Sequence, residues 1–261
     1  MIRFLTFTLT FIFAITTSAE VIPVDQVETG FFISSTPTNT LYWKGTNSKA
    51  LILLIPGGEG NLNLKPTTTN MRLNFFQTLK SLTNPDQTSG KYDVVLFDSP
   101  YPMNNIAPRG AKDHLIRIES VIQFYHNKTN LPIWIMGHSN GGISISEFIK
   151  YLQKNNKTNV IAGAIASGIR NQSFFNPPIE FPMLFVHHEK DGCINTRPSE
   201  SLLNYQKVKE FTKSDVQYVY IASGESEPND PCRSGYHMYF NAGAEFSKVM
   251  DAFIGKYYNS N

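Results

Sequence analysis

The sequence predicts an α/β protein built on a mostly parallel sheet with helices on both faces. Short, continuous apolar runs such as Ala50–Ile55 are typical of strands that are buried on both faces. From residue 50 to the C-terminus these runs alternate with amphipathic stretches of helical spacing. Such alternation builds parallel sheets, because each helix carries the chain back to the start of the next strand.

The length and composition fit one globular domain better than two. The chain has 261 residues, 41% of them hydrophobic and 17% charged, which suits one sizeable core over residues 20–261. The formal net charge is only +2, and Lys and Arg are scattered along the chain. This balance argues against a nucleic-acid partner.

The first 19 residues have the pattern of a secretory signal peptide. Arg3 precedes an uncharged, largely apolar run from Phe4 to Ile15, and small residues end the segment at Ala19. An uncleaved anchor is the alternative, but this run of 12 residues falls short of the roughly 20 that span a bilayer. We expect cleavage after Ala19, no stable membrane insertion of the mature chain, and a secreted or periplasmic location. The cysteines Cys193 and Cys232 agree with export, since an oxidising compartment would pair them.

The N-terminal part of the mature chain predicts a hairpin followed by a buried strand. Two β-prone pieces, Phe31–Ile33 and Leu41–Trp43, are expected to form the opening antiparallel hairpin. Ala50–Ile55 follows as a strand and ends in Pro56-Gly57-Gly58-Glu59-Gly60. These glycines free the backbone to turn and expose its amides, although a plain tight turn has the same composition.

Two helices and one strand are predicted next. Apolar residues at helical spacing predict a helix over residues 71–82, and residues 93–97 form a second buried strand. A polar loop rich in Pro and Asn leads to Arg109. Asp113 is then expected to cap a helix that runs through Phe124.

The stretch that begins at Leu131 carries the strongest signal for chemistry. An apolar strand runs into Gly137-x-Ser139-x-Gly141, and an amphipathic helix follows from Ile143 to Leu152. A serine on a sharp strand-to-helix turn presents its hydroxyl above the sheet, and small flanking residues let the strand and helix approach. A chance match in an ordinary turn is the alternative, and the strand before and helix after the motif argue against it.

The C-terminal part supplies three further strands and a last helix. The strands are expected at Val160–Ala166, Phe181–Val186 and Val216–Ala222, and an amphipathic helix is expected at Ala242–Phe253. Active sites of parallel sheets lie beyond the carboxyl ends of the strands, so the loops after these strands are the place to look for chemistry.

Two of these loops offer partners for a nucleophilic serine, which needs a base and an acid that orients the base. Asp191 follows the strand Phe181–Val186, and His237 precedes the last helix. The chain order Ser139, Asp191, His237 is the order expected of an enzyme with a nucleophile elbow.

With these residues and motifs, the chain from about residue 30 to the C-terminus resembles the α/β-hydrolase superfamily. The resemblance implies Ser139 as nucleophile, Asp191 as acid and His237 as base. It also implies an oxyanion hole made by the amide of Asn140 and an amide of the loop after the third strand, for which Gly58 is the expected donor. Relatives often have His where this chain has Pro56, so the register of that donor is open by one residue.

Other residues of the sequence are alternatives for the acid and the base, and a metal site is an alternative for the chemistry. Asp98 is an alternative acid because it follows an earlier strand, while Glu189 and Glu225 are expected at the surface. His187 and His188 lie near Asp191, but adjacent side chains on an extended segment point to opposite sides, which favours His237. A zinc site would need His-x-x-x-His or Cys-x-x-Cys spacing, which is absent from the sequence, so neither a metal nor a cofactor is expected.

If the resemblance holds, the loops that carry Asp191 and His237 are neighbours. A disulfide between Cys193 and Cys232 would then clamp the acid and base loops together, and two unrelated free thiols are the alternative.

The resemblance also bears on substrate and activity. Only residues 167–180 separate two predicted strands where larger relatives insert a cap, so no substantial cap and an open site are expected, with Phe174, Phe175, Pro177 and Pro178 as an apolar rim. A serine hydrolase of the carboxylesterase kind, acting on a small-molecule ester or a peptide-like substrate, is the leading hypothesis. A peptidase, thioesterase or acyltransferase would use the same residues, and a catalytically silent binding protein on the same fold is the alternative from another class. Oligomeric state is not predicted.

Overall fold

The computed structural model describes residues 19–27, 35–65, 74–83, 88, 90–226 and 230–258. The predicted signal peptide, up to residue 18, and the β-prone piece at residues 31–33 lie outside the described residues. In the described part of the chain, no helix is both long enough and apolar enough to cross a membrane.

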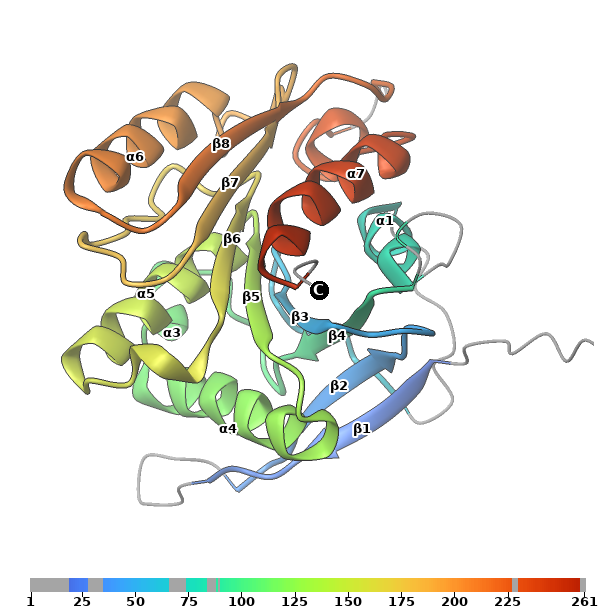
Figure 1. The fold of residues 1–261 in the computed structure, drawn as a ribbon, viewed down its shortest axis with the longest axis vertical. Helices are drawn as coiled ribbons and strands as arrows, with labels where there is room; N and C mark the ends of the chain where they lie inside the picture. The colour runs from blue at the N-terminus through green and yellow to red at the C-terminus, as the bar shows by residue number, and fades with distance from the viewer. Residues whose placement is uncertain are drawn as a thin grey trace, which may run out of the picture.

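An eight-stranded sheet in the order β1-β2-β4-β3-β5-β6-β7-β8 forms the centre of the molecule (Figure 1). The strands β3 to β8 run parallel to one another, whereas β2 is antiparallel to both β1 and β4. The predicted α/β class is therefore confirmed. The strands are β1 (Glu20–Val24), β2 (Thr38–Trp43), β3 (Ala50–Ile55), β4 (Tyr92–Asp98), β5 (Ile133–His138), β6 (Gly163–Ser167), β7 (Met183–His188) and β8 (Val216–Ile221).

Helices cover both faces of this sheet, as predicted (Figure 1). On one face lie α4 (Lys112–Thr129), α5 (Gly141–Lys154) and α6 (Pro198–Phe211), and on the other lie α1 (Asn74–Lys80) and α7 (Gly243–Ile254). A short helix, α3 (Ile106–Arg109), and the single turns η1 (Ser81–Thr83), η2 (Thr158–Val160), η3 (Gly235–Met238) and η4 (Gly255–Tyr257) complete the helical elements.

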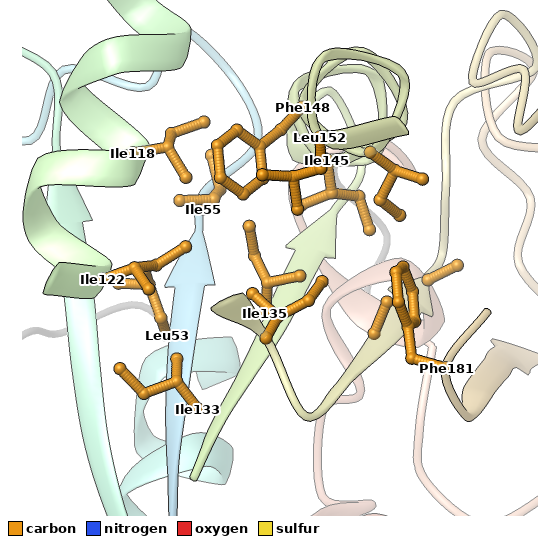
Figure 2. Packing of buried hydrophobic residues seen from close by; sticks show 14 of the residues in the cluster. Leu53, Ile55, Ile118, Ile122, Ile133, Ile135, Ile145, Phe148, Leu152 and Phe181 are labelled. Carbon is orange, nitrogen blue, oxygen red and sulfur yellow. The ribbon is translucent and has the colours of Figure 1, made fainter. Parts of the chain in front are cut away.

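Two layers of buried apolar side chains hold the helices to the sheet. Figure 2 shows the layer under α4 and α5, where Ile118 and Ile122 of α4 and Phe148 of α5 pack on Leu53 of β3 and Ile135 of β5. All six residues of β3 and all six of β5 are buried. Because both faces of these central strands are covered, their sequences read as continuous apolar runs, which made them predictable.

Several local predictions were wrong. The opening hairpin was expected from Phe31–Ile33 and Leu41–Trp43, but the strand that precedes β2 and pairs with it is Glu20–Val24. Asp113 lies inside the first turn of α4 and binds Arg117 at 2.7 Å, while Ala111 occupies the cap position. The helix α6 was not predicted at all, because only Ser201 and Val208 of its residues are buried and its apolar face is correspondingly weak.

No helix or strand interrupts Gly168–Pro182 between β6 and β7, so no cap is inserted there. The predicted apolar rim from this segment is wrong. Phe175 is 2% exposed and packs edge-on against Phe185 of β7, and Pro177 and Pro178 line a hollow with Gln153 on the α5 side. The connection therefore contributes to the core, and of its two phenylalanines Phe174 is the one that projects into solvent.

Candidate active site

Ser139 occupies the turn between β5 and α5, and its backbone is strained as the sequence motif predicts. Its φ is 54°, a left-handed conformation that is uncommon for a residue with a side chain. The turn is also crowded, since a Cβ on Gly137 would lie 2.4 Å from the carbonyl oxygen of Gly141, and one on Gly141 would lie 2.0 Å from that of Ile55. Glycine is required at these positions because the strand and helix almost touch.

Asp191 and His237 meet beyond the ends of β7 and β8. The Nδ1 of His237 lies 2.8 Å from Oδ2 of Asp191, and both side chains are almost fully buried. A carboxylate only accepts hydrogen bonds, so in the neutral ring of His237 the proton is on Nδ1 and the free lone pair is on Nε2. This is the tautomer that a general base requires.

Asp191 has three further donors, which hold it in place. Oδ2 accepts from Nε2 of His187 at 3.0 Å and from the Thr196 hydroxyl at 3.0 Å, and Oδ1 accepts from the backbone N–H of Cys193 at 2.9 Å. Burial alone would raise the pKa of Asp191, but the hydrogen bonds from His187 and His237 outweigh it and hold this pKa far below its usual range. The carboxylate is therefore ionised at neutral pH.

The bond from His187 to Asp191 is a feature that the sequence analysis missed. His187 and His188 do lie on opposite sides of β7, as expected, with His188 bonded to the carbonyl oxygen of Ser223 at 2.9 Å. After β7 the chain turns back toward the side on which the His187 ring lies. This turn places Asp191, four residues later, within 3.0 Å of that ring. Only the closed loop geometry brings this pair together.

Ser139 and His237 line the same cavity, of about 360 Å³, together with Phe75, His138 and the loop Pro56–Gly60. Within the part of the chain that the structure describes, no hydrogen bond joins the Ser139 hydroxyl to the His237 ring. His138 stacks on Phe75 with ring centroids 3.9 Å apart and lies 4.9 Å from the His237 ring. Burial, and then the neighbouring His237, lower the pKa of His138 well below its usual value, so this floor of the cavity is neutral.

The loop after β3 packs directly on the serine. A Cβ on Gly57 would lie 2.7 Å from Cβ of Ser139, so the Gly57 backbone is in close contact with the turn. Neither Gly57, Gly58 nor Asn140 donates its backbone N–H to another backbone group among the described residues. These three N–H groups therefore remain available beside Ser139.

A buried arginine holds this loop from behind. Arg109 is 0% exposed, and its guanidinium donates to the carbonyl oxygens of Gly58 at 2.9 Å and Pro56 at 3.4 Å. In a trans peptide the N–H points opposite to the C=O, so the N–H of Gly57, which shares its peptide unit with the Pro56 carbonyl, points away from Arg109. Gly57 thereby joins Gly58 as a candidate donor, and the role of Arg109 carried no sequence signal.

The structure also places the predicted disulfide and the alternative acid. The disulfide between Cys193 and Cys232 is present, which confirms the predicted pairing. Asp98, the alternative acid, accepts hydrogen bonds from the backbone N–H groups of Leu62 and Leu64, and burial raises its pKa. It has no hydrogen bond to a histidine within the described ranges. Across the described ranges, no group of three or more His, Cys, Asp or Glu side chains is arranged to hold a metal ion.

Comparison by sequence finds no family model and no curated protein that matches the chain. Comparison by structure finds a lidless serine hydrolase from Xanthomonas campestris, at 9% identity and a TM-score of 0.59, over 94% of this chain and 98% of that chain. A dienelactone hydrolase from Anabaena variabilis matches at 10% identity and a TM-score of 0.61, over 92% and 99% of the two chains. A thermophilic carboxylesterase from a metagenomic library matches at 13% identity and a TM-score of 0.58, over 90% and 87%.

The chain therefore has the α/β-hydrolase fold, in a form without a lid. Identities this low establish the fold alone, and the activity of each neighbour is its own.

Proposed function

We propose that the protein is an exported serine hydrolase that cleaves a small-molecule carboxylic ester by acyl transfer. The observation that carries the proposal is the buried 2.8 Å contact between Asp191 and His237, because His237 lines a cavity that is also lined by Ser139 in its strained turn. Perturbed titrating groups gathered in a cavity with a nucleophile are typical of catalytic sites.

In this mechanism His237 accepts the proton of Ser139 through Nε2 as the serine oxygen attacks the ester carbonyl. Asp191 stabilises the imidazolium that forms, and its four donors keep it from turning away from His237. His237 then gives the proton to the departing alcohol. A water molecule, activated by the same ring, releases the acyl group from Ser139.

The developing alkoxide needs donors that are already in place. The backbone N–H of Asn140 and that of Gly58 or Gly57 are proposed for this role, since none of them is used by another backbone group among the described residues. Loss of one such donor costs roughly 3 to 4 kcal/mol of transition-state stabilisation in comparable sites.

Export is the less central part of the proposal. The apolar run before Ala19 and the disulfide between Cys193 and Cys232 both suit an oxidising compartment. Mass analysis of the mature N-terminus in the culture medium or periplasm of the producing cells tests it, and an intact Met1 in a cytosolic fraction would refute it.

The activity is tested with short-chain 4-nitrophenyl esters and the purified chain from residue 20. The wild type is expected to turn over, Ser139→Ala to lose activity to background, and Asp191→Asn to lose on the order of 10⁴ in kcat, as in comparable triads. Retained turnover in Ser139→Ala would exclude Ser139 as the nucleophile.

A further inference from the structure

Two arginines lie on either side of the turn that carries Ser139, and neither has a carboxylate partner in the described part of the chain. Arg109 is fully buried, and the hydrogen bonds that it makes to described residues go to carbonyl oxygens and the Ser144 hydroxyl. Arg170 is partly exposed and follows β6, where its backbone N–H donates to the carbonyl oxygen of Ser139 at 3.2 Å. Unpaired cations this close to one another are costly in the folded protein, which points to a functional role.

The side chain of Arg170 is oriented but not neutralised. Nη1 donates to Oδ1 of Asn140 at 2.8 Å, and Nε donates to Oε1 of Gln172 at 3.2 Å. Both acceptors are neutral amides. A guanidinium has five N–H donors in a rigid fork, so the remaining ones are free to bind an oxyanion in two-pronged fashion.

These donors face a cavity of about 360 Å³ beside the Ser139 turn. Its polar lining is made of amide side chains, Asn104, Asn105 and Asn140, and Arg170 is its one charged residue. Ile106 and Ile143 give it an apolar wall, because the start of α3 packs beside α5 (Figure 1). No acidic side chain among the described residues lines it. A carboxylate would find a cation, amide donors and no repelling charge there.

This amide-lined cavity lies next to a second one that reaches the reaction centre. A neighbouring cavity of about 400 Å³ shares Asn104, Asn140 and Arg170 with it and reaches Ser139. Three further charged residues line this neighbour. Asp230 and Arg233 lie 3.6 Å apart and offset each other, and Glu59 is exposed and does not line the amide-lined cavity.

Arg109 adds to the positive potential from below. Burial, and then the charge of Arg170, lower the pKa of Arg109 to about 10, so it stays protonated at neutral pH. Since the two cations are close enough to affect each other, a bound anion is attracted by both.

The position of His237 tells which half of an ester would occupy the amide-lined cavity. The base must stand beside the leaving oxygen to return the proton, and His237 lines the Phe75 cavity, not the two that contain Arg170. The alcohol thus leaves past His237, and the acyl group lies toward Arg170.

We propose that the substrate is a half-ester of a short dicarboxylic acid, with the free carboxylate of its acyl group bound by Arg170 and the neighbouring asparagine amides. This inference rests on the proposed function, because it takes Ser139 as the nucleophile. Ser139 displaces the alcohol, which leaves with the proton from His237, and water then hydrolyses the acyl–serine ester to release the dicarboxylate.

The test compares monoethyl glutarate with its neutral isostere, the ethyl ester of glutaric acid monoamide, by release of ethanol. Wild type is expected to favour the anionic ester at least tenfold in kcat/KM, as a charge-assisted hydrogen-bonded pair supports. Arg170→Gln is expected to bring this ratio close to one, and Arg170→Lys to keep part of it. The ratio is the readout, because loss of Arg170 also loosens Asn140 and slows both esters.

A matched charge change at the exposed Arg197, Arg197→Gln, controls for net charge and should keep the wild-type ratio. Free glutarate is expected to inhibit wild type better than glutaric acid diamide, which tests the inference even if Arg170→Gln does not fold. Equal efficiency of wild type on both esters, or an unchanged preference in Arg170→Gln, would overturn the inference. If neither ester is cleaved while Ser139 still reacts with a fluorophosphonate, only the substrate class is refuted. If Ser139 does not react, the proposed function itself fails.

Discussion

The guanidinium of Arg109 donates from Nη2 to the carbonyl oxygen of Gly58 at 2.9 Å, from a position with no solvent exposure. The same carbonyl accepts from Nδ2 of Asn140 at 2.9 Å, so the loop after β3 and the turn after β5 are tied together. These bonds hold the loop against the turn that carries Ser139, and the further bond from Arg109 to the Pro56 carbonyl oxygen directs the N–H of Gly57 away from Arg109.

Replacement of Arg109 is therefore expected to reduce kcat more than it raises KM. Arg109→Met removes the support of Pro56 and Gly58, and we expect kcat to fall at least tenfold, with about 1–3 kcal/mol lost from the free energy of unfolding. The kcat of Arg109→Lys should lie between those of wild type and Arg109→Met. Arg117, also fully buried but bonded to Asp113 and to β2, offers the control: Arg117→Met should lose stability and keep its kcat. A wild-type kcat in folded Arg109→Met would show that Arg109 is not needed to position the loop after β3.

Substitution at Gly57 tests the close contact between the loop and Ser139. The added methyl of Gly57→Ala would lie 2.7 Å from Cβ of Ser139 and 3.0 Å from the carbonyl oxygen of His138, so the loop or the serine must move. A displacement of about 1 Å at a reacting group can cost about 100-fold in rate, and we expect a loss of that order in kcat/KM. Gly243→Ala, at the start of α7, is the control, because its added methyl would lie 3.6 Å from the nearest atom, the hydroxyl oxygen of Thr78. Equal activity of the two variants would contradict the crowding.

The buried His114 predicts a dependence of stability on pH. It bonds to the Ser144 hydroxyl at 3.0 Å, and burial, then the charges of Arg109 and Arg117, lower its pKa to about 3. Between this value and the unfolded value of about 6.5, the unfolded chain binds one more proton, so stability falls as the pH falls. At about 1.4 kcal/mol per pH unit, His114 should account for about 2 kcal/mol of the loss between pH 7 and pH 5.

Urea unfolding of wild type and His114→Gln at the two pH values isolates this contribution from that of the other histidines. The variant should lose about 2 kcal/mol less than wild type over the same interval. Identical losses in both proteins would show that His114 does not titrate in this way.

The disulfide predicts linked losses of stability and activity on reduction. It spans 39 residues, and release of such a loop costs about 4 kcal/mol on the chain-entropy account. Activity should also fall, since Cys193 donates its N–H to Asp191 and Cys232 lines the cavity of Ser139. The measurements are chemical unfolding and ester hydrolysis of wild type with and without reductant, compared with the double variant Cys193→Ala, Cys232→Ala. Full activity and unchanged stability after verified reduction would argue against a clamp.

Much of this architecture was predictable because the central strands are covered on both faces. Ala50–Ile55 was predicted with its observed bounds, and the glycines around Ser139 signalled a crowded turn. The predicted partners Asp191 and His237 lie 2.8 Å apart. This contact was predicted from their order in the chain and from the rule that the carboxyl ends of parallel strands lie at one edge of the sheet.

The remainder depends on contacts that no local pattern encodes. Arg109 is the last residue of the short helix α3, far from Gly58 in sequence, and His187 reaches Asp191 only through the shape of one turn. Asp113 is of a residue type that often caps helices, yet it lies inside the first turn of α4 and forms an ion pair with Arg117 one turn later. Phe174 and Phe175 were both expected at the rim of an open site because the segment 167–180 is too short for a cap. Packing against Phe185 is what buries Phe175.

The central claim is that Ser139 is an activated nucleophile, and covalent labelling tests it most directly. The purified chain with its disulfide intact would be incubated with a fluorophosphonate and the adduct mapped by peptide mass, beside Ser139→Ala and His237→Ala. We predict one adduct, on Ser139, that is absent from the serine variant and strongly slowed in the histidine variant. A folded protein that takes up no label, or takes it up elsewhere, would contradict the account and favour a binding protein on a hydrolase fold.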